Sequence, residues 1–112
     1  MTAISEAEYE ERAAPELNAL LDALDAVDDD GVEAELGSDI LTLEFADGTR
    51  YIVNSHRAAR QIWMAADRNA WHFDWVPADE RWIAAKTGDE LWATLERVIS
   101  GKLGHGVELK RG

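Results

Sequence analysis

The sequence predicts an α+β domain in which two helices cover one face of an antiparallel sheet of five or six strands. Apolar side chains recur at helical spacing near both ends of the chain and alternate with polar ones over residues 32–85. Short turns join the alternating stretches, which favours neighbouring antiparallel strands. Chains of 112 residues rarely divide into two domains. We therefore expect a single domain over residues 1–112, built as a two-layer sandwich.

The first helix is predicted to begin near Glu6. Ser5 and Glu8 have the spacing of a capping box, in which each side chain satisfies a free backbone N–H. Pro15 lacks a backbone N–H, so we expect a kink or a restart of the helix there. The apolar stripe that should face the sheet consists of Leu17, Leu20, Leu21 and Leu24. Glycine is favoured just after a helix, so the end is expected at Asp28-Asp29-Asp30-Gly31.

Six stretches in the middle of the chain have the alternating pattern of half-buried strands. The Asp47-Gly48 pair is a strong signal for a tight hairpin turn, and Pro77 marks a second turn at residues 77–80. Each strand should direct one set of alternating side chains at the helices and the other set at an open face. The expected strands are residues 32–36, 39–45, 50–54, 60–65, 70–76 and 81–85.

A final helix is predicted near the end of the chain. Thr87 should cap it, with Glu90 at the third position of the cap motif. Its apolar stripe consists of Leu91, Trp92, Leu95, Val98 and Ile99. The tail that follows contains several glycines and a short strand-like stretch at residues 107–109. Both helices then have one apolar face, and both can pack on the same side of the sheet.

Composition excludes several classes of protein. The chain contains no cysteine, which excludes disulfides, thiolate nucleophiles and cysteine-bound zinc or clusters. No apolar run approaches the ~20 residues of a membrane helix, and the N-terminus does not resemble a signal peptide. We therefore expect a cytoplasmic protein that does not enter a membrane. Nucleic-acid binding is disfavoured because phosphates repel a chain of net charge −12.

The negative charge is concentrated at the beginning of the chain. Residues 1–47 carry 15 acidic residues and one basic residue, a net −14, whereas residues 48–112 carry a net +2. Such an acidic surface either keeps the protein in solution or forms a cation site or a docking surface for a basic partner. Carboxylate oxygens suit hard cations such as Fe³⁺, Mn²⁺, Ca²⁺ and Mg²⁺. A calcium loop around Gly31 is excluded, since Ala26 and Gly37 would fall on ligand positions.

The sequence contains no recognisable catalytic motif. A nucleophile elbow, a phosphate-binding loop and a dinucleotide-binding glycine pattern are all absent. His56, His72 and His105 lack the spacing of metal ligands, so each is expected to be structural or on the surface. We therefore expect a binding protein and not an enzyme.

Trp63 is the strongest candidate for a binding residue outside the acidic region. Alternation places Trp63 and Gln61 on one face of a strand, with Ile62 and Met64 on the other. The aliphatic pair is the better core candidate, which would leave Trp63 exposed on an open sheet. An exposed tryptophan in that position suggests an anchor for a partner. Partial cover of its ring by neighbours such as Arg60 is the alternative.

Several short segments form a recognisable combination. They are residues 41–48 (LTLEFADG), Asn54 followed by Gln61-Ile62-Trp63-Met64-Ala65, His72-Phe73-Asp74, Arg81-Trp82-Ile83 and residues 87–92 (TGDELW). Together with the helix–strands–helix order and the acidic first helix, these segments resemble the frataxin family, and its bacterial branch in particular. The resemblance covers almost the whole chain.

The resemblance implies an iron-binding protein that attends iron–sulfur cluster assembly. Members of this family bind ferrous and ferric iron loosely through carboxylates of the first helix and first strand. They also dock on the cysteine desulfurase, near its scaffold protein. By resemblance, the metal-binding residues are Asp22, Asp25, Asp28, Asp29, Asp30, Glu33 and Glu35. The partner-binding residues are Asn54, Gln61, Trp63 and His72. We expect a monomer, and whether iron makes it oligomerise stays open.

The chain departs from the family pattern at a few positions. His56 stands where glutamine is frequent, and Pro15 interrupts a helix that is usually continuous. Two alternatives to the implied role stay open: a ferroxidase or iron-storage activity, and a metal-independent acidic adaptor. A ferroxidase normally holds paired irons with Glu-x-x-His motifs, which this sequence lacks.

Overall fold

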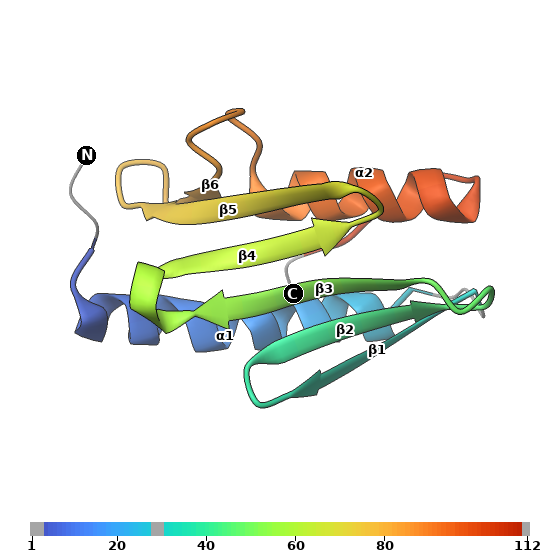
Figure 1. Cartoon of the computed structure of the whole chain (residues 1–112), viewed down its shortest axis with the longest axis horizontal. Helices are drawn as coiled ribbons and strands as arrows, with labels where there is room; N and C mark the ends of the chain where they lie inside the picture. The colour runs from blue at the N-terminus through green and yellow to red at the C-terminus, as the bar shows by residue number, and fades with distance from the viewer. Residues whose placement is uncertain (1–3, 28–30, 111–112) are drawn as a thin grey trace.

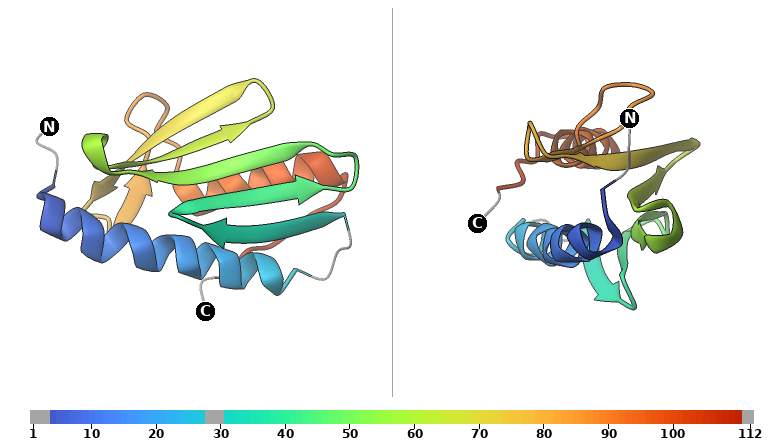
Figure 2. Two further views of the ribbon diagram at one scale, coloured as in Figure 1. Left: turned by 60° about the horizontal axis from the view of Figure 1, so that its bottom comes forward. Right: turned by 90° about the vertical axis from the view of Figure 1, so that its left-hand side faces the viewer.

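The chain folds into two layers, a six-stranded antiparallel sheet and two helices that cover one of its faces (Figures 1 and 2). The structure is a computed structural model that describes residues 4–27 and 31–110. Strands follow one another in chain order across the sheet, and the helices are α1 (Glu6–Asp25) and α2 (Leu91–Leu103). The strands are β1 (Val32–Gly37), β2 (Ile40–Phe45), β3 (Arg50–His56), β4 (Gln61–Ala66), β5 (Asn69–Val76) and β6 (Arg81–Ile83). The predicted fold class is confirmed.

The core lies between the helices and the covered face of the sheet. In β2, Leu41, Leu43 and Phe45 are buried, while the residues between them face the other way. The other strands contribute Tyr51, Val53, Ile62, Met64, Ala66, Phe73, Trp75 and Trp82. The helices contribute Tyr9, Ala13, Leu17, Leu20 and Leu24 from α1 and Leu91, Leu95 and Ile99 from α2. Since both helices lie on this face, the opposite face of the sheet is left open by the described parts of the chain, as Figure 2 shows.

The helix α1 continues through Pro15, so the expected restart is wrong. Pro15 is exposed, and Ala13 and Leu17 on either side of it are buried against the sheet. Packing of these neighbours holds both halves in one helix and offsets the lost backbone hydrogen bond. The helix ends at Asp25, earlier than expected, and Asp28, Asp29 and Asp30 lie outside the described residues. Within the described chain, neither helix combines the length and the apolar character that a membrane span requires.

The final helix begins at Leu91, and its cap is Glu90, so the predicted cap at Thr87 is wrong. The Glu90 carboxylate accepts hydrogen bonds from the backbone N–H groups of Trp92 (2.8 Å) and Ala93 (3.1 Å). The negative charge of this carboxylate also interacts favourably with the positive N-terminal end of the helix dipole. The hydroxyl of Thr87 instead accepts a bond from the N–H of Asp89, in the turn before the helix.

The strand-like stretch at residues 107–109 does not join the sheet. Val107 and Leu109 are buried, which explains the alternating pattern. Their backbone N–H groups donate to side chains of α2, to Ser100 Oγ at 2.9 Å and to Glu96 Oε2 at 2.9 Å. Side-chain acceptors on the helix therefore replace a neighbouring strand.

We predict that Pro15→Ala raises the free energy of unfolding by about 1–3 kcal/mol. Alanine restores a backbone donor in the middle of α1, and the exposed position leaves room for the change. Urea unfolding followed by circular dichroism measures the difference. The control is Glu11→Ala, an exposed change one turn earlier that should stay within about 0.5 kcal/mol. An unchanged or lower stability of the Pro15 variant would contradict the prediction.

Candidate functional site

The predicted acidic residues that the structure describes lie in two places. Asp22 and Asp25 are exposed in the last turns of α1, on the covered side of the sheet. Glu33 and Glu35 are exposed on β1, the strand at one edge of the sheet, and belong to its open face. The edge strand thus separates two pairs of carboxylates, because alternation directs its glutamates away from the helix layer.

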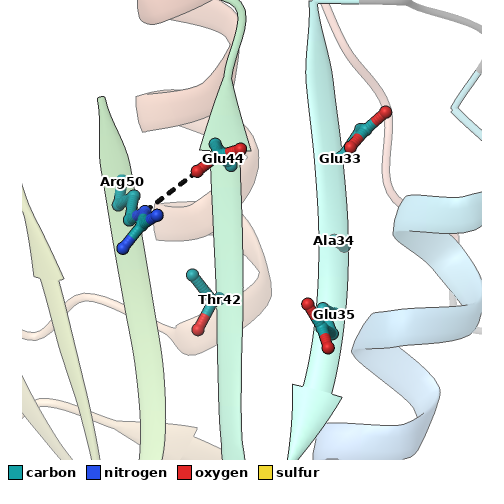
Figure 3. Close-up of a pocket in the computed structure, with 6 residues that line it drawn as sticks. All are labelled: Glu33, Ala34, Glu35, Thr42, Glu44 and Arg50. Atoms are coloured by element: carbon teal, nitrogen blue, oxygen red, sulfur yellow. Dashed lines mark hydrogen bonds and ion pairs between the residues drawn. The ribbon is translucent and has the colours of Figure 1, made fainter. Parts of the chain in front are cut away.

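On the open face, Glu33 and Glu35 line a hollow of about 490 Å³ together with residues of β2 and β3 (Figure 3). The register places Glu33 directly opposite Glu44, and like charges in such a pair repel each other. Arg50 on β3 donates from Nε to Glu44 Oε2 at 3.0 Å, which offsets part of this repulsion. Thr42 stands opposite Glu35 and contributes to the lining. The hollow is therefore a shallow site with negative charge on two strands.

Glu44 was missed as a candidate by the sequence analysis. The signal was present, since the Asp47-Gly48 turn and the alternation of the two strands bring residues 33 and 44 to one face. Among residues 4–27 and 31–110, no three histidine, aspartate or glutamate side chains are arranged to hold a metal ion. Exposed carboxylates without a preformed cage suit hard cations that are bound loosely and keep part of their water.

The four predicted partner-binding residues lie together in the middle of the open face. Strand register places Asn54 of β3, Trp63 of β4 and His72 of β5 in one row across the sheet. Gln61 lies two residues along β4 from Trp63, on the same face, with Asp74 opposite it on β5. Residues far apart in the chain thus form one surface, because three consecutive strands pair without a shift.

Trp63 is half-buried, and two imidazole rings cover its indole. The His56 ring stacks on one side with ring centroids 3.7 Å apart, and the His72 ring stacks nearly parallel with centroids 4.2 Å apart. The indole Nε1–H donates to Gln61 Oε1 at 2.8 Å. Gln61 Nε2 in turn donates to Asp74 Oδ1 at 3.1 Å. Trp63 lies on the open face, as expected, but it is less exposed than a free anchor would be. The residues that cover it are His56 and His72.

Apolar side chains extend this surface towards the acidic hollow. Ile40 and Ile52 are 43% and 39% exposed, respectively. Ile40 pairs with Asn54, and Ile52 pairs with both Thr42 and Ala65. Two exposed isoleucines on the same sheet face as Trp63 form an apolar strip, which on a monomer often marks a contact surface.

The first helix supports this region from the covered side. The Tyr9 hydroxyl shares a hydrogen bond with Ser55 Oγ and donates to the backbone oxygen of Gln61 at 3.0 Å. Burial raises the pKa of Tyr9 above its ordinary value, so the hydroxyl stays protonated and can donate. These bonds fasten the end of β3 and the start of β4 to α1. The backbone beneath Trp63 is therefore held in place.

Comparison with known proteins agrees with this architecture. A family model described as a Frataxin-like domain matches residues 2–105. The "Iron-sulfur cluster assembly protein CyaY" of Paraburkholderia phymatum is 37% identical over 106 residues, which are 95% of this chain and 98% of that protein. The protein of the same name from Tolumonas auensis is 38% identical and covers 78% of this chain and 81% of its own. Among solved structures, frataxin from Psychromonas ingrahamii superposes with a TM-score of 0.84 at 23% identity, covering 96% of this chain and 99% of that one.

We predict that Trp63→Ala lowers the free energy of unfolding by only about 1–2 kcal/mol. The ring is half-buried on the open face, whereas truncation of a fully buried aromatic ring costs about 3–5 kcal/mol. Trp82, which is 1% exposed in the core, provides the matched control, and Trp82→Ala should show the larger loss. Chemical denaturation of both variants measures the difference. Equal losses would place Trp63 in the core.

Proposed function

Because this chain belongs to the frataxin family, we propose that it assists iron–sulfur cluster assembly by binding iron loosely and docking on a cysteine desulfurase near its scaffold protein. One observation carries the proposal: a single open sheet face holds exposed carboxylates at one edge and the row around Trp63 at its centre. The role is one of binding, in the cytoplasm, by a monomer. The relatives that span nearly the whole chain are named for iron–sulfur cluster assembly, which supports this reading.

Iron is proposed to bind at the exposed carboxylates of α1 and β1. Asp22, Asp25, Glu33 and Glu35 provide hard oxygen ligands, and the chain contains no cysteine that would favour a softer metal. Asp28, Asp29 and Asp30 connect the two elements in sequence and complete the proposed set. Repulsion among these groups costs folding stability, and a bound cation relieves it. Binding should therefore be weak, involve several sites and stabilise the fold.

Docking is proposed to combine the acidic region with the centre of the open face. The net −14 on residues 1–47 creates a charge axis that accelerates and orients encounter with a basic surface. Asn54, Gln61, Trp63 and His72 then provide the short-range fit. Iron and basic side chains compete for the same carboxylates, so bound iron should alter docking.

We predict that cations raise the melting temperature through the proposed acidic set. At ten times its Kd, a ligand stabilises the fold by about 1.4 kcal/mol, which corresponds to a rise of about 6 °C in the melting temperature of a domain of this size. Fe²⁺ under anaerobic conditions and millimolar Ca²⁺ or Mg²⁺ should each produce an increase. Calorimetric titration and thermal unfolding measure both effects.

The controls for the cation prediction are paired charge removals. Asp22→Asn with Asp25→Asn, and separately Glu33→Gln with Glu35→Gln, should each weaken the effect. Asp79→Asn with Glu80→Gln removes the same charge from an exposed turn and should leave it unchanged. One tight iron site that survives both acidic pairs would contradict the proposal. Rapid oxygen consumption with Fe²⁺ would instead favour the ferroxidase alternative.

We predict that affinity for the cysteine desulfurase falls as salt rises. The screening length shortens from about 10 Å at 0.1 M to about 3 Å at 1 M ionic strength, which weakens attraction between separated charges. Asp22→Asn with Asp25→Asn should reduce the salt dependence, whereas Trp63→Ala should mainly speed dissociation. Surface plasmon resonance at several ionic strengths measures both rates. Affinity that is indifferent to salt and to the aspartates would show that the charge serves only to keep the protein in solution.

A further inference from the structure

His56, Trp63 and His72 form a continuous stack of three rings on the open face. The two outer rings lie nearly parallel to the indole, with interplanar angles of 13° and 14°. The rings come from three neighbouring strands, β3, β4 and β5, so the stack lies across the strand direction. His72 pairs directly with Trp63, whereas His56 stands opposite Gln61, two residues along the strand pair and on the same face. His56 therefore has to lean along the sheet to reach the indole.

The local backbone holds His56 in this position. His56 ends β3 and caps the short 3₁₀ helix η1 (Arg57–Ala59), where its Nδ1 accepts a hydrogen bond from the N–H of Ala59 at 3.3 Å. Arg60 closes the turn in a left-handed conformation, with φ 54°, and its Nη1 donates to the backbone oxygen of Ile4 at 3.0 Å. The imidazole is thus fixed from two directions, by its bond to the turn and by its contact with the indole.

This arrangement determines what Trp63 can offer to another molecule. Imidazoles cover both faces of the indole, and Gln61 accepts the bond from its N–H. A cation from a partner cannot lie over a face that is already covered, and a partner's acceptor would have to displace Gln61. The part of the ring left for contact is its apolar edge, on the same sheet face as the exposed Ile40 and Ile52.

We propose that His56 is a positioning residue that, with His72, holds the Trp63 indole on edge for apolar contact with a partner. The inference rests on the proposed function in one respect, the use of Trp63 in docking. A side chain fixed before binding loses less freedom when the complex forms. An unstacked indole could adopt several rotamers and present its face or its N–H instead.

Two substitutions distinguish the effect of the His56 ring from the effect of its hydrogen bond to Ala59. His56→Phe keeps an aromatic ring for the stack and loses the acceptor for the Ala59 N–H. His56→Gln keeps a polar acceptor and loses the ring. His105→Ala changes an exposed histidine beyond α2 and serves as the matched control. Thermal unfolding of each variant confirms that it is folded before its spectra are compared.

Proton NMR of the Trp63 ring, assigned with Trp63→Phe, tests the inference without any partner. Rings stacked on both faces should shift the indole protons upfield in the wild type. We expect His56→Phe to keep this shift and His56→Gln to lose about half of it, while His105→Ala has no effect. Trp63 resonances that are unchanged in His56→Gln, or equal in the Phe and Gln variants, would overturn the inference.

The affinity of the same variants for the cysteine desulfurase provides a second test. If Trp63 is no longer held in place, it must lose its rotational freedom when the complex forms, which weakens binding about two- to tenfold. We expect this loss of affinity for His56→Gln and near wild-type binding for His56→Phe. Wild-type affinity of His56→Gln, despite altered Trp63 resonances, would overturn the role of the stack in docking. Wild-type affinity of Trp63→Ala would instead overturn the proposed function, and the NMR result would still decide whether His56 positions the indole.

Discussion

The unshifted antiparallel pairing of six consecutive strands is the constraint on which the rest of the structure depends. Because pairing continues from β1 to β6 in chain order, the alternation within each strand adds up to two uniform faces. One face meets both helices and becomes the core. A shift of one residue in β2 would exchange the buried Leu41 and Leu43 for Glu44, and a shift in β4 would exchange Ile62 and Met64 for Trp63. The pairing therefore decides at once what is packed and what is displayed.

The sequence was sufficient to predict the fold and the face on which Trp63 lies, because both follow from periodicity. Ile62 and Met64 are buried and Trp63 is on the open face, as alternation requires. The stack around Trp63 was not predictable in the same way. His56 reaches the indole through the geometry of a three-residue 3₁₀ turn and its left-handed closing residue, Arg60, which no periodic pattern encodes.

Other differences between expectation and structure have a common origin in tertiary packing. Pro15 opposes a helix locally, but buried residues on both sides of it hold α1 in one piece. Residues 107–109 alternate like a strand, and hydrogen bonds to side chains of α2 use the same alternation without a neighbouring strand. In both places, contacts made by the folded chain override the structure that the local sequence favours.

Charge and shape are divided between different strands of the open face. The exposed glutamates lie on β1 and β2, where Glu33 faces Glu44 across the pair, whereas the ring stack lies on β3, β4 and β5. Glutamates on an edge strand also discourage its pairing with the edge of another sheet. In the proposed docking, a cation at that edge would change the long-range attraction and leave the stack untouched. The two parts of the surface can therefore respond to separate signals, because attraction acts over the screening length and fit acts only at contact.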